Sequence, residues 1–133
     1  AANYIRASLN DCFHLPFVEP SMHEVVFTDR EQLAHGVKTL DIAKRLLDHG
    51  HHAPTIYFPL VVSGALMIEP TETESLATLD SFIASMLAIA EESRVDPESV
   101  LGAPSATPLG RLDETRAARS PVLRWYPDAT VPD

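Results

Sequence analysis

Polar side chains frame two apolar runs in the stretch HHAPTIYFPLVVSGALMIEPTETES. His51 and His52 precede the first run, while Glu69, Thr71 and Glu72 follow the second. Imidazole and carboxylate groups are the ones that enzymes use most often for proton transfer. The pattern therefore indicates either an ordinary hairpin with polar ends or the edge of an active site.

Other site chemistries find little support in the sequence. The spacing of His49, His51 and His52 matches no standard zinc signature, because a helical pair of ligands needs i, i+4 spacing and Cys-containing sites need more than the single Cys12. No G-x-S-x-G, G-x-G-x-x-G or Walker pattern occurs. The acidic residues after the second run also suit the N-terminus of a helix. We therefore predict no metal site, no nucleophilic triad and no phosphate-binding loop.

The bulk properties restrict the class of protein. A chain of 133 residues with 45 % hydrophobic residues suits one globular domain. The chain has a net charge of −9 and no stripe of basic residues that could neutralise phosphates, so we predict no nucleic-acid partner. No apolar run approaches the ~20 residues of a membrane-spanning helix, and the N-terminus lacks the pattern of a signal peptide. A single cysteine allows no internal disulfide, which fits a reducing compartment.

Periodicity and turn residues predict the elements that carry the polar side chains. The alternation in HEVVFTD predicts a strand, and TIYF and ALMIE predict two more, joined by a loop at Ser63 and Gly64; residues 55–60 and 66–69 are expected to form sheet core. A helix is expected from Thr39 to His49, with Thr39 as its cap and Gly50 as its left-handed end. The other expected helices are the last turns of one at 3–9, a long one at 75–94 with a stripe of Leu76, Leu79, Ile83, Met86 and Ala90, and short ones near 96–97 and 111–119.

These elements predict an α/β (α+β) domain in which helices pack on one face of a short mixed or antiparallel sheet. We expect residues 1–94 to form the domain, with 1–10 as the end of a linking helix from a longer protein. Residues 95–133 form a proline-rich extension. Its apolar side chains, Val122, Leu123, Trp125 and Tyr126, gain roughly 1.5–3 kcal/mol each on burial, so we expect it to pack on the domain or on a partner.

Three stretches of the chain resemble one known family. MHEVVFTD, KTLDIAKRLLDHGHHAPTIYFP and ALMIEPTETESLATLDSFIASMLAIAEE are similar to the C-terminal region of the glycine-cleavage P-protein, a pyridoxal-phosphate-dependent glycine decarboxylase. The likeness is strongest to the second subunit of the two-subunit bacterial form. The opening ANYIRASL and the ending TPLGRLDETRAARSPVLRW resemble it as well, so the likeness covers nearly the whole chain.

This resemblance implies the small C-terminal domain of a fold-type-I pyridoxal-phosphate enzyme in the bacterial cytoplasm. In that family, a lysine of the large domain holds the cofactor, and the aminomethyl group of glycine passes to the lipoyl arm of the H-protein. The only lysines here, Lys38 and Lys44, fall at the start of and inside an amphipathic helix. The implied partners are therefore the large domain, the first P-protein subunit and lipoylated H-protein, and the fragment is not expected to decarboxylate glycine alone.

The resemblance also implies where a site would lie. The polar ends of the two apolar runs would approach the cleft between the small and large domains, and none of them is expected to be catalytic by itself. Capping and turn hydrogen bonds would account for the same side chains. The candidates for this cleft are His52, Thr55, Glu69, Thr71, His23 and Glu24.

Two alternatives remain open. The chain could be a non-catalytic docking or dimerisation module, or the small domain of another fold-type-I enzyme such as an aminotransferase. Many aminotransferases hold the substrate carboxylate with an arginine on a small-domain strand, but ALMIEPTE contains none. We hypothesise that a decarboxylase lacks this arginine because a guanidinium would stabilise the substrate carboxylate in the ground state. An arginine introduced at Leu66 or Met67 should therefore weaken decarboxylation more than glycine binding.

Overall fold

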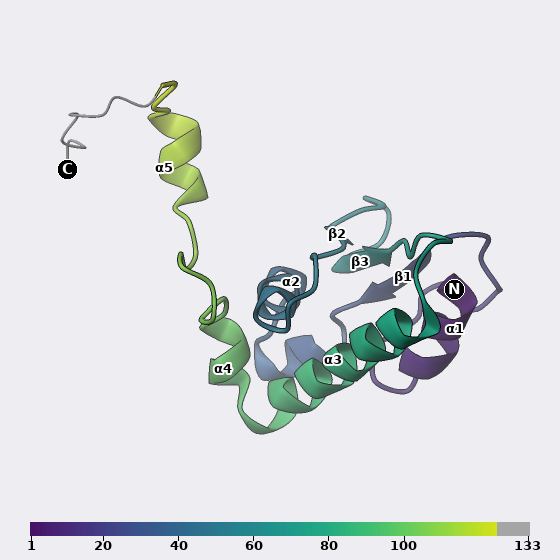
Figure 1. The fold of residues 1–133 in the computed structure, drawn as a ribbon. Coiled ribbons are helices and arrows are strands. Elements are labelled where there is room, and N and C mark those ends of the chain that lie inside the picture. Colours follow the sequence, from purple (N-terminus) through teal and green to yellow (C-terminus); the bar gives the residue numbers. More distant parts are fainter. Residues whose placement is uncertain (125–133) are drawn as a thin grey trace.

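The computed structural model describes residues 1–124, in which helices pack on one face of a small antiparallel sheet (Figure 1). This architecture confirms the predicted α/β class. The elements in chain order are α1 (Ala2–Leu9), β1 (Val25–Thr28), the 3-10 helix η1 (Gln32–His35), α2 (Thr39–Asp48), β2 (Thr55–Ile56), β3 (Ala65–Ile68), α3 (Leu76–Val95), α4 (Pro97–Leu101) and α5 (Glu114–Arg119).

The sheet has the strand order β1-β3-β2, so β3 is central. Val25 pairs with Ile68 on one side of β3, and Thr55 pairs with Met67 on the other. The predicted strand TIYF is wrong beyond Ile56, however, because β2 ends there. Tyr57 has a φ of 57°, in the left-handed region, which ends the ladder. Residues 57–60 therefore form a loop rather than sheet core.

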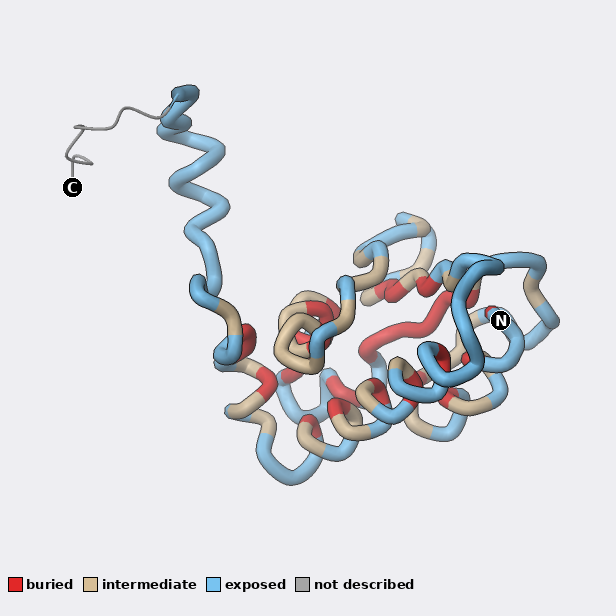
Figure 2. The backbone as a smooth tube through the Cα atoms, viewed as in Figure 1, coloured by how far each residue is buried: buried red, intermediate tan, exposed pale blue. Residues whose placement is uncertain are grey.

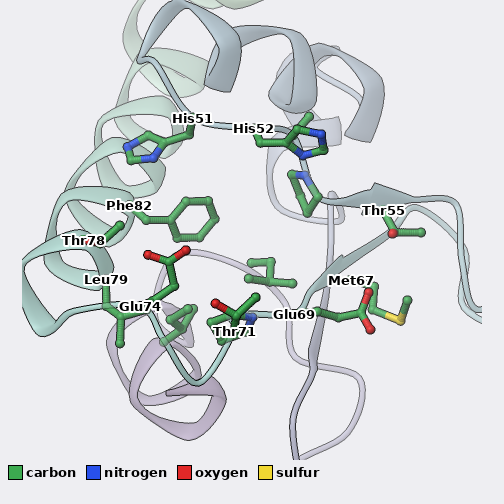
Figure 3. A pocket seen from close by; sticks show the side chains of 15 residues that line it. His51, His52, Thr55, Met67, Glu69, Thr71, Glu74, Thr78, Leu79 and Phe82 are labelled. Atoms are coloured by element: carbon green, nitrogen blue, oxygen red, sulfur yellow. The ribbon is translucent and has the colours of Figure 1, made fainter.

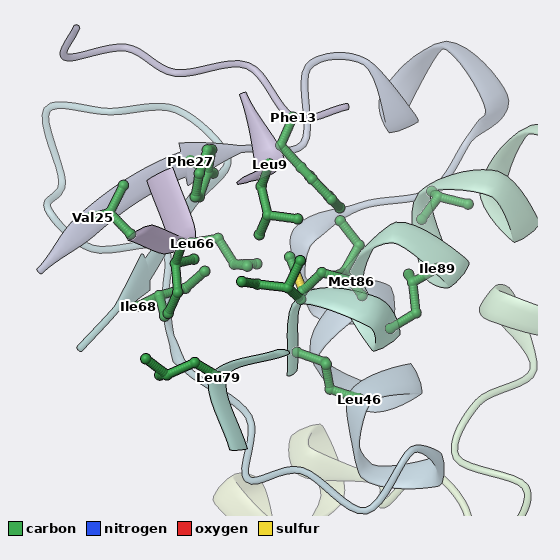
Figure 4. Packing of buried hydrophobic residues seen from close by; sticks show 14 of the residues in the cluster. Leu9, Phe13, Val25, Phe27, Leu46, Leu66, Ile68, Leu79, Met86 and Ile89 are labelled. Atoms are coloured by element: carbon green, nitrogen blue, oxygen red, sulfur yellow. The ribbon is translucent and has the colours of Figure 1, made fainter. Parts of the chain in front are cut away.

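The core lies between the sheet and the helices (Figure 4). Phe27 and Leu66 from the sheet meet Met86 and Ile89 of α3 and Leu46 of α2, all almost fully buried. The predicted stripe of α3 is correct in its middle, but Leu76 at its start is 62 % exposed because it lies at the helix N-terminus outside the core cluster. Burial of side chains this large contributes roughly 1.5–3 kcal/mol each, so this cluster holds the sheet to the helices.

A polar junction joins the end of β1, the start of α2 and the loop before β3. The backbone N–H of Thr39 donates to Asp29 Oδ2 at 2.9 Å, and its hydroxyl donates to the Gly64 carbonyl oxygen at 2.7 Å. The predicted role of Thr39 as the helix cap is wrong, because Lys38 occupies the cap position and Thr39 is the first helical residue. The Thr39 side chain is thereby free to bind the loop. Gly50 ends α2 with a φ of 79°, as predicted.

The beginning of the proline-rich extension is bound to the body. α4 packs on α2 and α3, and Ala103 is fully buried. The Asp48 carboxylate then accepts hydrogen bonds from the backbone N–H groups of Ser105 and Ala106 at 2.8 and 2.7 Å. Farther along, Arg111 Nη1 lies 2.7 Å from Asp41 Oδ1. Asp48 and Asp41 are both on α2, so this helix holds the extension in two places.

Beyond residue 111 the chain leaves the body. α5 has no buried residue, and it projects away from the sheet and helices (Figures 1 and 2). Val122 and Leu123 are 78 % and 90 % exposed. Trp125 and Tyr126, which carry part of the argument for packing, lie outside the described residues. Packing of this extension on a partner therefore stays a prediction.

The junction predicts that Gly64→Ala is strongly destabilising. Gly64 has a φ of 66°, and an added Cβ would lie 2.0 Å from Asp29 Oδ1. The left-handed backbone costs an alanine about 1–2 kcal/mol, and displacing Asp29 adds about 1–3 kcal/mol for the hydrogen bonds of Thr39. Gly50→Ala is the matched control, since Gly50 also has positive φ but nothing within 4 Å of the added Cβ. Urea unfolding of both variants checks this, and equal losses would contradict it.

The hydrogen bonds of the Asp48 carboxylate to the extension predict that the stability of the fold depends on pH. Burial raises the pKa of the Asp48 carboxyl, but hydrogen bonds from the backbone of Ala106 and Ser105 and from Arg45 outweigh burial and hold this pKa below its usual value. The ionised group therefore stabilises the fold above the unfolded-state pKa of about 3.9. This contribution is lost as the pH falls through the folded-state pKa.

Asp48→Asn is accordingly expected to lower the free energy of unfolding by about 1–3 kcal/mol at neutral pH. The difference from the unsubstituted chain should shrink as the pH falls below about 3.9. Urea titrations over a series of pH values measure it. Glu19→Gln removes an exposed carboxylate and serves as the control. A difference that stays constant with pH would show that the charge of Asp48 is not involved.

Candidate functional site

An open pocket of about 350 Å³ lies at the end of the sheet, where three segments meet (Figure 3). The segments are the connection from α2 into β2, the end of β3 with the turn after it, and the first turns of α3. The lining residues are Ile5, His51, His52, Ala53, Pro54, Thr55, Met67, Ile68, Glu69, Pro70, Thr71, Glu74, Thr78, Leu79 and Phe82.

Local structure explains why these segments converge. Gly50 reverses the chain after α2, and the backbone N–H of His51 donates to the Leu46 carbonyl oxygen at 3.0 Å. The pairing of Thr55 with Met67 then places the entry to β2 beside the end of β3. The Ser75 side chain caps α3 by accepting from the Thr78 N–H at 3.1 Å. The start of α3 is therefore fixed at the pocket edge.

Four of the six predicted site residues line this pocket. His52, Thr55, Glu69 and Thr71 come from both sides of the hairpin, and all four are exposed to solvent. The remaining two, His23 and Glu24, lie just before β1 and do not line it. Instead, His23 Nε2 lies 2.9 Å from Glu24 Oε2. The structure thus groups the first four residues, and their role in binding stays a prediction.

The pocket also contains residues that sequence reasoning did not select as candidates. His51 packs edge-on against Phe82, with ring centroids 5.5 Å apart and an interplanar angle of 88°. His51 Nε2 lies 3.1 Å from Ser85 Oγ, so the ring is held from two positions on α3. Phe82 and Ser85 are three residues apart and share a helix face. This spacing is visible in the sequence, but nothing in the sequence says that this face meets His51.

The charge of the lining is one-sided. Glu69 and Glu74 supply carboxylates, and in Figure 3 the Glu74 side chain points toward Phe82. No lysine or arginine is among the 15 lining residues. Lys38 and Lys44 are both on or next to α2, outside the pocket. The pocket therefore lacks the primary amine that an imine with pyridoxal phosphate needs and the cations that a phosphate group prefers.

Two further features of the described residues bear on the kind of site. Within residues 1–124, no three His, Cys, Asp or Glu side chains converge as ligands for a metal ion. The same part of the chain has no helix that is both long and apolar enough to cross a membrane. The fold and the pocket together define a small α/β domain with an open pocket whose lining contains neither lysine nor arginine.

Comparison with known proteins identifies this class of domain more closely. Residues 1–101 match the family model described as glycine dehydrogenase, C-terminal domain. The chain belongs to this family. This membership argues against an aminotransferase small domain.

Curated relatives agree with the family. The chain is 58 % identical over 124 residues to the "probable glycine dehydrogenase (decarboxylating) subunit 2" of Staphylococcus haemolyticus, a match covering 93 % of this chain and 25 % of that protein. The protein of the same name from Listeria innocua matches with the same identity and coverage. That of Desulforamulus reducens is 50 % identical over 128 residues, covering 96 % of this chain and 26 % of the relative. The chain therefore spans about a quarter of the length of these relatives.

Proposed function

We propose that this chain forms the small C-terminal domain of the second subunit of a pyridoxal-phosphate-dependent glycine decarboxylase, the P-protein of the glycine cleavage system. In this proposal the pocket is one wall of the substrate cleft, and a large domain forms the opposite wall. The observation that carries the proposal is the open pocket at the sheet end, polar at its mouth and without lysine. The family match over residues 1–101 supports it.

The proposal assigns the cofactor to the rest of the enzyme. Pyridoxal phosphate supplies the electron sink for loss of CO₂ when it is bound. The residues of this chain do not fit the role of its anchor, because neither Lys38 nor Lys44 reaches the pocket. Their proposed contribution is to shape the cleft: Phe82 and Leu79 offer apolar surface that excludes water, and Glu69 offers a hydrogen-bond acceptor.

The proposed partners follow from the open side of the pocket. A pocket that is open to solvent needs a second surface to bury a small substrate such as glycine. We assign that surface to the large domain of the same subunit, with the first P-protein subunit beside it. The lipoyl group of the H-protein would then receive the aminomethyl group at this cleft. A bacterial cytoplasmic location belongs to the same proposal.

A docking or dimerisation module is the second candidate function, and exposed apolar side chains favour it. Leu60 and Val61 in the loop between β2 and β3 are 85 % and 89 % exposed. Contiguous exposed apolar surface is a feature of interaction sites, and these two residues are adjacent in the chain. The two functions differ in one respect, because a module that only docks does not need the carboxylate of Glu69.

Glu69→Gln in the complete two-subunit enzyme tests the proposal. Loss of a charged hydrogen-bond acceptor at the cleft is expected to lower kcat/KM for glycine decarboxylation about tenfold. Glu72→Gln is the matched control, because Glu72 is exposed, carries the same charge and does not line the pocket. Release of CO₂ from labelled glycine measures both variants. Equal activity of the two would favour the docking module.

Met67→Arg tests the hypothesis about the missing arginine. Met67 lines the pocket, whereas Leu66 is 1 % exposed in the core, so only Met67 can be replaced without introducing a charge into the core. A guanidinium near the substrate carboxylate should lower kcat about tenfold and leave glycine binding nearly unchanged. Steady-state kinetics and equilibrium binding of glycine separate the two effects. Equal losses in both would refute the hypothesis.

A further inference from the structure

Residues 109–124 form an arm that leaves the body of the domain at Arg111, beside Asp41. Every residue from 108 to 124 is exposed, and α5 has no buried residue. The cap of α5 is local, since the Asp113 side chain accepts from the Arg116 N–H at 2.8 Å. α5 has only six residues, whereas isolated helices shorter than about 12–15 residues are marginal in water. A helix of this length therefore needs a surface beyond its own domain to stabilise it.

The arm also exposes large apolar side chains. Four of them are 66–90 % exposed: Leu109, Leu112, Val122 and Leu123. Val122 and Leu123 are adjacent in the chain, so they form one apolar group at the far end of the arm. Removal of apolar surface from water is the main driving force of protein association. The end of the arm is therefore suited to enter an apolar groove.

The body of the domain carries such a groove, with a volume of about 510 Å³. It lies where the end of β1, η1 and the loop before β3 meet. Its apolar lining consists of Pro16, Phe17, Leu33, Val61 and Val62. Phe17, Leu33 and Val61 are 53 %, 51 % and 89 % exposed, so the domain does not cover this lining itself. The groove offers both space and apolar surface to a pair of aliphatic side chains.

Charge favours a second copy of this chain as the owner of the groove that the arm meets. Residues 109–124 carry four arginines and two acidic residues, a net charge of +2. Residues 1–108 carry six basic and fifteen acidic residues, a net charge of −9. Asp29 and Arg30 both line the groove and offset each other, while the exposed residues Asp11 and Glu31 line an adjacent hollow that shares His14 with it. The surroundings of the groove thus attract a basic arm.

We propose that two copies of this chain form a symmetric dimer in which the arm of each copy binds in the groove of the other. Val122 and Leu123 enter the groove, and Arg119 lies toward the carboxylates beside it. α5 projects away from its own sheet and helices (Figures 1 and 2), so the arm is directed to another molecule. Closed two-fold pairing is the commonest arrangement of identical subunits, and exchange of arms covers both apolar surfaces.

This inference goes beyond the proposed function and does not depend on it. A domain that closes a substrate cleft can also pair with a second copy, and the readout is the mass of the chain rather than glycine turnover. Failure of one proposal therefore leaves the other intact.

Sedimentation equilibrium of the 133-residue chain tests the dimer. The unsubstituted chain should dimerise with a dissociation constant below about 1 mM. Leu123→Asp should raise this constant at least about tenfold, because a carboxylate then has to enter the apolar groove. Val61→Asp should act in the same way from the groove side. Met22→Asp is the matched control, since Met22 is 91 % exposed and belongs to neither the arm nor the groove.

The charge argument has its own test in the same measurement. Arg119→Glu places a carboxylate near Asp11 and Glu31 and should weaken the dimer about threefold. Arg94→Glu is the control for reversal of an exposed arginine, because Arg94 pairs with Glu91 on α3, outside the arm and the groove. Equal dissociation constants for the two variants would refute the part assigned to charge.

Mixing two variants tests the exchange itself. Neither Leu123→Asp nor Val61→Asp forms an intact contact with its own kind. In a mixture, the intact arm of the Val61→Asp chain meets the intact groove of the Leu123→Asp chain. The mixture should therefore associate at least about threefold more tightly than either variant alone.

The outcomes decide the proposal. A chain that stays monomeric at about 1 mM overturns it and assigns the arm to a different partner. A dimer that Leu123→Asp does not weaken overturns it as well. Loss of association in both variants without recovery on mixing shows that arms pair with arms or grooves with grooves, which refutes the exchange. Circular dichroism checks the fold of each variant, and Leu33→Asp replaces Val61→Asp if the latter does not fold.

Discussion

The junction of Asp29, Thr39 and Gly64 is the constraint on which the arrangement of the domain depends. Three segments separated in sequence end within one set of hydrogen bonds: β1, α2 and the loop that leads into β3. Asp29 also donates its own backbone N–H to the Gly64 carbonyl oxygen at 3.2 Å, which continues the ladder between β1 and β3. The backbone N–H of Thr39 donates to this buried carboxylate at 2.9 Å and offsets part of the cost of removing the carboxylate from water. The junction thus fixes α2 relative to the sheet, and with it the chain that leaves α2 toward the pocket.

Local chemistry in the sequence predicted most of the fold. Alternation in β1, the helical spacing of α2 and α3, and the left-handed glycine after α2 each depend on neighbouring residues alone. Phe58 shows where this reasoning failed. An aromatic residue suits a strand, yet it follows Tyr57 in a left-handed conformation and is 51 % exposed. Thr39 is a similar case, because a threonine that looks like a cap is used for a contact 25 residues away.

The pocket was predictable only in part, for a related reason. The polar ends of the two apolar runs could be brought together from the strand pattern, which is why Glu69 and His52 were selected. Which face of α3 closes the pocket depends on the angle at which that helix crosses the sheet. Core packing through Met86 and Ile89 sets this angle, and single-sequence patterns do not contain it. The contact between His51 and Ser85 could therefore not be predicted from the sequence.

The hydrogen bonds between Asp48 and the extension have a consequence for the substitutions that the extension can accept. The carboxylate binds the main chain at positions 105 and 106, and the buried neighbour Ala103 contributes little more than a methyl group. The Ser105 hydroxyl adds a hydrogen bond to Asp48 Oδ2 at 3.3 Å, but the shorter bonds come from main-chain N–H groups, which every residue except proline has. Substitutions at these two positions by residues other than proline would therefore leave the main-chain hydrogen bonds to Asp48 in place. One side chain, Asp48, thus anchors the extension mainly through the backbone that it binds.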